Sequence, residues 1–136
     1  MSKCQIFSFT DDLDEVVADG LYMRAVVGEA MSIGVVNFRM RKGSDLAIKA
    51  HAHGEEVTLQ LRGGCAVNLG WDPSKPERTV QLEEGVVMLM PAQQPHSGVN
   101  RFDADGWCLR LNVVTPPRNE YGTKGNAKPF YPAETK

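Results

Sequence analysis

The chain has 136 residues, 42% hydrophobic and 24% charged, which is enough for one globular domain whose core needs no disulfides. Its formal net charge is −2, without any block of like charge, which argues against a nucleic-acid-binding protein. No apolar run reaches the roughly 18 residues of a membrane-spanning helix, and the N-terminus has no long apolar core, so we expect a cytoplasmic protein without a membrane segment or secretory signal.

The predicted elements are mainly short β-strands. A short helix over residues 11–20 comes first, because the segment opens with acidic residues and ends at Gly20. Runs rich in Val, Leu, Met and aromatic residues, separated by Gly, Pro, Asn or Asp, then predict strands at residues 35–40, 56–62, 65–70, 78–82, 86–90 and 107–114. About one strand per ten residues is typical of an antiparallel sandwich or barrel.

The last part of the chain differs in composition. From Thr115 the sequence is rich in Pro, Gly and Lys, so we expect no regular structure there. Residues 1–115 are therefore predicted to form one β-domain, and residues 116–136 an irregular tail that packs on the barrel or on a partner subunit. The three cysteines form no CxxC pair, so we expect free, buried thiols in a reducing compartment.

Two predicted strands alternate clearly between apolar and polar residues. In residues 56–62, one face carries Val57, Leu59 and Leu61, and the other carries Glu56, Thr58 and Gln60. In residues 107–114 the polar face carries Arg110 and Asn112. Such a strand can turn its polar face to water, or it can place that face along a polar cavity and pack the other on a core.

The stretch "HAHGEE" holds two of the three histidines of the chain. In an extended segment His51 and His53 point to the same side, and Gly54 allows a turn that brings Glu55 or Glu56 back toward them. His96 follows another predicted strand after a short turn. Imidazoles bind zinc, iron, copper and nickel, and an added carboxylate extends this to manganese. An HxH alone is more often an ordinary polar segment, and the third histidine is what favours a metal site.

The spacing of these residues resembles the two sequence motifs of the cupin superfamily. "HAHGEEVTLQLRG" is similar to the first motif, with Glu56 and Gly63 six residues apart, and "GVVMLMPAQQPHSGVN" is similar to the second. The turn between His53 and Glu56 is one residue shorter than the pattern, and Gly43 lies two residues too far upstream. Gln93 replaces a glycine of the second motif, which implies a slightly different turn.

The resemblance implies an all-β fold, namely a single cupin barrel of the jelly-roll type with a short flanking helix or turns. It is loosely similar to single-barrel cupins of the pectin-degradation type. It also implies a homodimer and one divalent metal ion, either iron, manganese, zinc or nickel. The implied metal ligands are His51, His53, Glu56 and His96.

The other candidate site residues follow from these ligands. Glu55 is the alternative ligand, or an acid/base group beside the metal. Thr58 and Gln60 share the face of Glu56 and are candidate substrate-binding residues. Arg110 is a candidate anchor for a carboxylate or enolate, because its guanidinium matches planar anions, although a surface arginine is the alternative.

A cupin metal site of this kind implies an enzyme for a small oxygen-chelating substrate, such as a carbonyl, enol or hydroxy acid. The reaction would be that of an isomerase, lyase, cyclase or dioxygenase, through Lewis-acid and enolate chemistry. The alternative is a non-catalytic cupin that binds a sugar-like small molecule or acts as a sensor.

Overall fold

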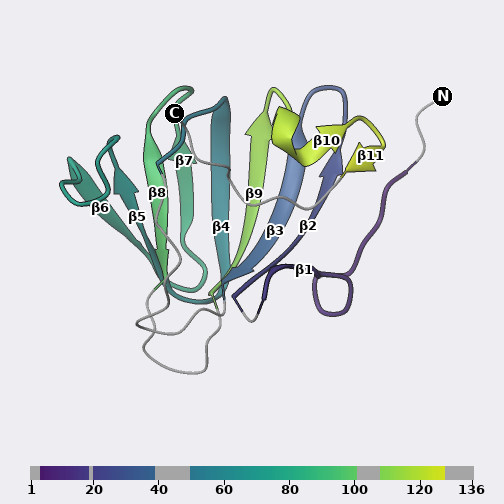
Figure 1. Ribbon diagram of the computed structural model, residues 1–136, viewed down its shortest axis with the longest axis horizontal. Helices are drawn as coiled ribbons and strands as arrows, with labels where there is room; N and C mark the ends of the chain where they lie inside the picture. Colours follow the sequence, from purple (N-terminus) through teal and green to yellow (C-terminus); the bar gives the residue numbers. More distant parts are fainter. Residues whose placement is uncertain (1–3, 19, 39–49, 101–107, 128–136) are drawn as a thin grey trace.

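The computed structural model describes residues 4–18, 20–38, 50–100 and 108–127. Nine strands build its two sheets: β1 (Asp14–Val17), β2 (Leu21–Val27), β3 (Ser32–Phe38), β4 (Glu55–Gly63), β5 (Cys65–Leu69), β6 (Arg78–Leu82), β7 (Val87–Met90), β8 (His96–Asn100) and β9 (Cys108–Thr115). The larger sheet has the order β1-β2-β3-β9-β4-β7, and the smaller has the order β6-β5-β8, with every pairing antiparallel (Figure 1). The predicted all-β antiparallel class is confirmed.

The N-terminal helix that was predicted over residues 11–20 is wrong. Part of this segment forms β1, whose residues Asp14 to Val17 pair with Leu21 to Met23 of β2. Strand β2 supplies backbone hydrogen-bond partners to this segment, whereas a short isolated helix would have to satisfy its backbone groups internally and is only marginally stable. The six predicted strand regions correspond to β3, β4, β5, β6, β7 and β9, whereas β2 and β8 were not predicted. Residues 39–40 and Trp107 of the predicted strands lie outside the described residues.

The segment that follows β9 contains regular structure, contrary to the expectation of an irregular tail. A 3-10 helix, η1 (Asn119–Tyr121), leads into a small hairpin of β10 (Gly122–Thr123) and β11 (Asn126–Ala127). In Figure 1 these elements lie at the end of the larger sheet where β9 ends, next to β2 and β3. The segment is fastened there because Gly125 donates a backbone hydrogen bond to Val27.

The inward-facing residues of the larger sheet line up in three rungs across the strands. The first rung comprises Val27, Ser32, Val114, Glu56 and Met90; the second comprises Ala25, Gly34, Asn112, Thr58 and Met88; the third comprises Met23, Val36, Arg110 and Gln60. The middle of each rung, on β9 and β4, is mostly polar. Apolar clusters lie on either side, one around Leu21, Met23 and Val36 and the other around Val67, Leu82 and Met90. The interior therefore holds a polar strip between two apolar cores.

The outer face of β4 and β7 is apolar and exposed. Val57 is 37% exposed, Val87 63% and Leu89 62%. Val57 lies opposite Leu89, and Leu59 lies opposite Val87, so these side chains form one aliphatic surface at the edge of the sheet. Apolar residues that a monomer leaves this open mark a surface for contact with another molecule.

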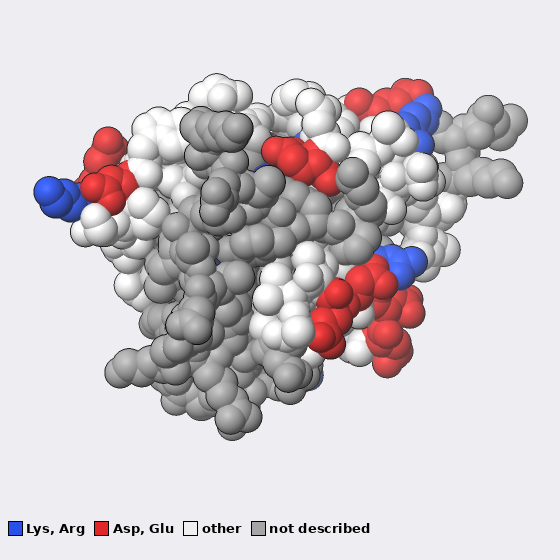
Figure 2. Space-filling model, in the orientation of Figure 1, with Lys and Arg blue, Asp and Glu red and all other residues white. Residues whose placement is uncertain are grey.

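The charged side chains on the surface are mixed. On the face shown in Figure 2, the most visible Lys and Arg side chains of the described residues each lie beside acidic ones near the edge of the molecule. One such pair joins Lys124 to Glu29. No helix among the described residues has the length and apolar character that crossing a bilayer requires.

The chain changes sheets within the "HAHGEE" stretch. His51 pairs with His96 at the start of β8, whereas Glu55 already belongs to β4 in the other sheet. Gly54 lies at this corner, and a Cβ atom there would overlap with the carbonyl oxygen of Thr115 and lie 2.8 Å from Cδ of Pro116. A glycine is required because the backbone of β9 passes so close.

Gln93 stands where the second cupin motif has a glycine, and it adopts a backbone conformation that glycine favours. Its φ is 64°, in the left-handed region, and its backbone N–H donates to the carbonyl oxygen of His53 over 2.7 Å. The expectation of a slightly different turn stays a prediction, and Gln93 itself adopts the left-handed backbone that glycine would favour. The cost of a left-handed non-glycine residue is about 1–2 kcal/mol.

We expect Gly54→Ala to lower the free energy of unfolding by about 2–3 kcal/mol, because the added methyl group meets backbone that cannot move without shifting β9. Chemical denaturation followed by circular dichroism measures this change. The matched control is Glu55→Ala, which alters an exposed neighbour and should change stability by less than about 0.5 kcal/mol. Equal stability of the two variants would contradict the proposed role of the corner.

Candidate metal centre

The three histidines of the chain converge in the structure. One ring nitrogen from each of His51, His53 and His96 lies within 4.8 Å of the others. The ring centroids of His51 and His96 are 4.3 Å apart, and those of His53 and His96 are 4.8 Å apart. Ligand nitrogens on one metal ion lie at most about 4.2 Å apart, twice a typical metal–nitrogen bond. A small inward movement of the rings therefore suffices to bind one ion.

Backbone hydrogen bonds fix this convergence. His51 and His96 exchange two N–H···O bonds of 2.9 Å each, which makes them a directly opposed antiparallel pair. His53 is held by its carbonyl oxygen, which accepts from Gln93 in the turn before His96. The first two histidines are thus placed relative to the third by main-chain geometry, without help from side-chain packing.

The tautomers of two of the rings can be deduced from their neighbours. Nδ1 of His53 lies 3.1 Å from the carbonyl oxygen of Gly54, and Nδ1 of His96 lies 2.8 Å from that of Gln94. A carbonyl oxygen only accepts, so each Nδ1 carries a hydrogen and each neutral ring presents the lone pair of Nε2. Such backbone acceptors are the usual means by which a metal-binding histidine is oriented.

Glu56 completes the cluster from β4. Its Oε2 atom lies 2.9 Å from Nε2 of His53 and 3.4 Å from Nε2 of His96, and its side chain is buried. Among the described residues, Nε2 of His53 and Oε2 of Glu56 have no hydrogen-bond partner. Lone pairs this close repel each other unless a proton or a cation lies between them. The donor set therefore fits a divalent cation, for which imidazole nitrogen and carboxylate oxygen are suitable ligands.

The electrostatics of the cluster favour the metal-binding forms of His51 and Glu56. Burial, reinforced by the nearby His96 and Arg118, lowers the pKa of His51 from its ordinary 6.5 to about 3, so this ring is neutral. Burial would raise the pKa of the Glu56 carboxyl group, but His53 and His96 outweigh it and hold that pKa well below its usual range. Neutral imidazoles and an ionised carboxylate are the forms that bind a metal.

Thr58 orients the carboxylate of Glu56. Its hydroxyl oxygen lies 3.1 Å from Oε1 of Glu56 and 3.0 Å from Oδ1 of Asn112 on the next strand. The hydroxyl hydrogen points toward these two acceptors, so Oε1 is occupied and Oε2 faces the histidines. Thr58 thus belongs to the site as a support for Glu56.

Arg110 lies across the interior below the histidines. It extends from β9 toward the other sheet, where a Cβ atom on Gly98 of β8 would lie 3.0 Å from its guanidinium. The guanidinium also lies 5.2 Å from the ring centroid of Phe38. Arg110 is buried, and among the described residues its Nε has no hydrogen-bond partner. Its guanidinium therefore places a positive charge in the interior, two rungs from the candidate metal ligand Glu56.

Gln60 turns away from the cluster. Its amide nitrogen donates to the carbonyl oxygen of Arg62 over 2.7 Å, and its amide oxygen lies 3.5 Å from the thiol of Cys65. The same amide nitrogen lies 3.9 Å from Sγ of Cys108. The contact with Cys65 and burial raise the pKa of the Cys108 thiol, so these two cysteines are the buried, unactivated thiols expected from the sequence. Cys4 is free but exposed, so the expectation that it is buried is wrong.

Glu55 is not brought to the cluster. It is exposed at the start of β4, opposite Thr115, and alternation places it on the outer face with Val57. Of the two adjacent glutamates, only Glu56 faces the histidines.

Two residues at the site were not found from the sequence. Arg118 and Tyr121 follow β9, and both are buried. The backbone N–H of Arg118 donates to Oγ of Ser32, a residue of the same rung as Glu56. The only sequence signal was their place in a segment rich in Pro and Gly, which gives no hint that it folds back inside.

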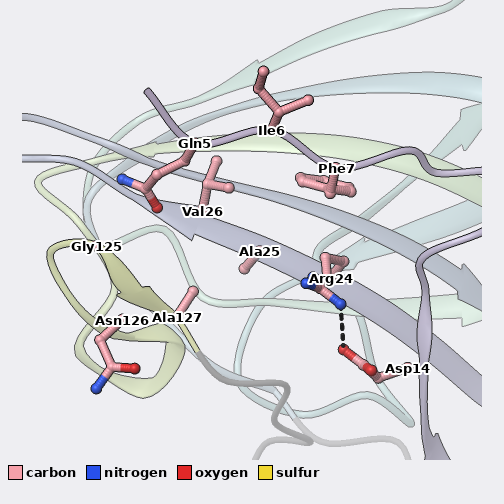
Figure 3. A pocket seen from close by; sticks show the side chains of 10 residues that line it. All are labelled: Gln5, Ile6, Phe7, Asp14, Arg24, Ala25, Val26, Gly125, Asn126 and Ala127. Carbon is pink, nitrogen blue, oxygen red and sulfur yellow. Dashed lines mark ion pairs between the residues drawn. The ribbon is translucent and has the colours of Figure 1, made fainter. Parts of the chain in front are cut away.

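A surface pocket of about 390 Å³ lies apart from the histidines, between the N-terminal segment, β2 and the β10–β11 hairpin (Figure 3). Its charged lining residues, Arg24 and Asp14, are half-exposed and pair with each other over 3.5 Å. Gln5 is fastened to the backbone of Val27 by two side-chain hydrogen bonds. The pocket has no buried charge or cluster of ligating groups, so it is not the candidate site.

Comparison with known proteins gives matches at the level of structure. No protein-family model and no curated protein matches the chain. An RmlC-like cupin from Shewanella frigidimarina superposes with a TM-score of 0.64 and 17% identity, covering 89% of this chain and 99% of that one. KdgF from Halomonas sp. superposes with a TM-score of 0.63 and 17% identity, covering 87% and 97%.

A third match is the hydroxypropylphosphonic acid epoxidase from S. wedmorenis, with a TM-score of 0.62 and 20% identity. It covers 81% of this chain, which spans only 59% of the epoxidase. That enzyme has been solved with Fe(II) and with Co(II). The shared architecture, together with the two converging motifs, shows that the chain has the cupin fold.

Proposed function

We propose that this protein is a metal-dependent cupin enzyme in which His51, His53, His96 and Glu56 bind one divalent ion. The observation that carries the proposal is the convergence of three imidazoles on the buried carboxylate of Glu56, whose Oε2 lies 2.9 Å from Nε2 of His53. Iron, manganese, zinc and nickel all suit three imidazoles and a carboxylate. The presence of iron and cobalt in a structural neighbour supports a first-row transition metal.

Protein purified without added metal is expected to contain about one equivalent of a transition metal, and His96→Ala is expected to contain little. Removing a group that only orients a ligand already weakens metal binding by about 10–100-fold, so removing the ligand itself should weaken it at least as much. Elemental analysis by mass spectrometry measures the content. Glu55→Ala is the matched control and should keep its metal.

Cobalt titration of chelator-treated protein separates loss of binding from loss of folding. Wild type should bind Co(II) and melt at a higher temperature in its presence, because a ligand bound only by the folded state stabilises it. His96→Ala should fold without this increase. If wild type contains no metal and added metals do not raise its melting temperature, the proposal fails.

The substrate proposed for this site is a small anion that chelates the metal through oxygen, such as an oxo acid, enol or hydroxy acid. Arg110 supports this choice, because a buried guanidinium with a free Nε among the described residues is stabilised by a bound carboxylate. Arg110 lies on the inward face of the larger sheet, two rungs from Glu56. A substrate with a chelating group at the metal and a carboxylate at Arg110 would span the distance between these two residues.

The chemistry follows from the same arrangement. A bound divalent ion would supply Lewis-acid polarisation of a substrate oxygen, or oxygen activation if the metal is iron. Arg110 would neutralise the negative charge of a substrate carboxylate or enolate. Thr58 would keep Glu56 on the metal and so leave it unavailable as a base. Isomerase, lyase, cyclase and dioxygenase reactions all use this set of groups.

Arg110→Met is expected to weaken the binding of 2-oxoglutarate to the cobalt-loaded protein by about tenfold or more, because the distal carboxylate of this probe loses a charged hydrogen bond in a buried site. The d–d absorption of cobalt reports the binding. Arg62→Met, on the exposed end of β4, is the matched control and should bind 2-oxoglutarate like wild type. Equal affinities for both variants would exclude Arg110 as the anchor.

We further propose that two copies of the chain pair through the aliphatic outer face of β4 and β7. Val57, Val87 and Leu89 form this face, and burying them against a second copy would remove exposed apolar area from water. A symmetric dimer is the commonest way in which one such face covers itself.

Leu89→Glu is expected to convert a dimer into a monomer, because it would place two carboxylates in an apolar interface. Light scattering after size-exclusion chromatography measures the mass. Gln81→Glu adds the same charge on the exposed β6 and should leave the dimer intact. A monomeric wild type at all concentrations would refute this interface.

A further inference from the structure

We propose that Asn112 is a specificity-determining residue of the substrate site, and that its amide oxygen accepts a hydrogen bond from a substrate hydroxyl that lies between the metal-binding end and the distal carboxylate. This inference rests on the proposed function, since it concerns the substrate of the same metal site. It narrows the substrate class to acids that carry such a hydroxyl group.

Asn112 lies between the candidate metal ligand and the candidate carboxylate anchor. It belongs to β9, which runs between β3 and β4 in the larger sheet (Figure 1). Asn112 pairs with Thr58, and Arg110 is the preceding inward residue of β9. Val114, the following inward residue, pairs with Glu56. Alternate residues of a strand are about 6.6 Å apart on one face, so a substrate that reaches from Glu56 to Arg110 passes Asn112.

The side chain of Asn112 is open to solvent although it lies on the inward face. Asn112 is half-buried, whereas Thr58 beside it is 2% exposed and Val114 on the same strand is 1% exposed. The backbone in this part of the sheet is therefore almost completely covered, so the exposed part of Asn112 belongs to its side chain. Nδ2 of Asn112 makes no hydrogen bond with the described residues, and it is not sealed from solvent as Nε of Arg110 is. Water therefore reaches this amide, and a small ligand has the same access.

Asn112 is linked to the candidate metal ligand through Thr58. The hydroxyl oxygen of Thr58 lies 3.0 Å from the amide of Asn112 and 3.1 Å from Oε1 of Glu56. A threonine hydroxyl has one hydrogen, and a metal-binding carboxylate only accepts, so this hydrogen goes to Glu56. With Oδ1 of Asn112 toward Thr58, two oxygens would then lie 3.0 Å apart without a hydrogen between them.

The opposite orientation of the amide satisfies all three groups. A half-turn about the Cβ–Cγ bond of Asn112 exchanges Oδ1 and Nδ2, so that the amide N–H donates to Thr58 while Thr58 donates to Glu56. Hydrogen bonds in such a chain strengthen one another. Oδ1 is then the solvent-accessible atom, so the ligand group opposite it must be a donor. An alcohol hydroxyl supplies that donor, whereas a methylene or carbonyl group does not.

Hydrogen exchange can test the orientation of the amide without any substrate. In zinc-loaded protein, one side-chain amide hydrogen of Asn112 is expected to exchange with water about tenfold or more slowly than those of Asn126, because it donates to the buried Thr58. Asn126 is exposed on β11 and is the reference. Magnetisation transfer from water in nitrogen-15 spectra measures the rates, and Asn112→Leu and Asn126→Leu assign the resonances. Equally fast exchange for both asparagines would overturn the inference.

The binding test compares diacids of equal length that differ in the number of hydroxyl groups. The pairs are tartrate with malate and xylarate with 2-hydroxyglutarate, and tartrate is used as each enantiomer. Wild type saturated with Co(II) should bind the more hydroxylated acid about five- to tenfold more tightly in at least one pair, as one additional hydrogen bond implies. The d–d absorption of cobalt reports each affinity.

Variants at position 112 show whether this preference comes from the amide. Asn112→Leu has a similar shape without polar atoms, so the ratio of the two affinities should fall about five- to tenfold relative to wild type. Asn112→Asp keeps an acceptor and should keep the ratio, although its charge weakens the binding of every acid. Asn126→Leu is the matched control and should bind all the acids like wild type. Because each ratio is compared with that of wild type, the intrinsic affinity of hydroxyl groups for cobalt cancels.

The outcomes separate this inference from the proposed function. If cobalt-loaded wild type binds none of these acids and no 2-oxoglutarate, the proposed function fails and this inference fails with it. If wild type shows no preference, if Asn112→Leu keeps it, or if Asn112→Asp loses it as Asn112→Leu does, the role of the amide oxygen is refuted while the metal site and Arg110 stand. A merely structural asparagine would lower the melting temperature without changing the ratio of affinities.

Discussion

The site depends above all on the pair of backbone hydrogen bonds between His51 and His96. These 2.9 Å bonds join two segments that are far apart in the sequence, and they do so at the residues whose side chains converge. The same pairing forces the chain to leave one sheet and enter the other within three residues. The close passage of Gly54 by Thr115 and the inward direction of Glu56 both follow from that constraint. Main-chain geometry thus places the histidines relative to one another, and Thr58 orients the carboxylate of Glu56 toward them.

Much of the fold could be predicted from the sequence because strands and turns leave a local pattern, and the candidate ligands could be named because their spacing resembles the cupin motifs. The alternation in residues 56–62 placed Glu56 and Thr58 on one face, and the resemblance favoured Glu56 as the ligand while leaving Glu55 as the alternative. The prediction of a helix at residues 11–20 was wrong because the backbone of this segment pairs with β2. That pairing is a tertiary contact, and the local sequence pattern does not indicate it. Tyr121 was missed for a similar reason, since its side chain packs against Gly34 on a distant strand.

The orientation of β4 shows what an alternating pattern cannot decide by itself. Its polar side chains are the buried ones, with Glu56 only 6% exposed, and its apolar side chains lie outside. A polar face is tolerated inside because its groups have partners, such as Thr58 with Glu56 and Asn112. The consequence of this arrangement is an exposed aliphatic outer surface on β4 and β7. The candidate metal ligand inside and the proposed dimer face outside therefore both follow from the alternation of one strand.

The folding back of the chain after β9 has a consequence for how such a protein can change over time. The candidate metal ligands come from residues 51–96, whereas Arg118 and Tyr121 come from a separate stretch that follows the last long strand. Mutation, insertion or exchange in that stretch can alter the interior beside β2 and β3 without changing any candidate ligand. The architecture thus assigns the candidate ligands and this neighbouring part of the interior to separate segments of the chain, so that each segment can vary independently of the other.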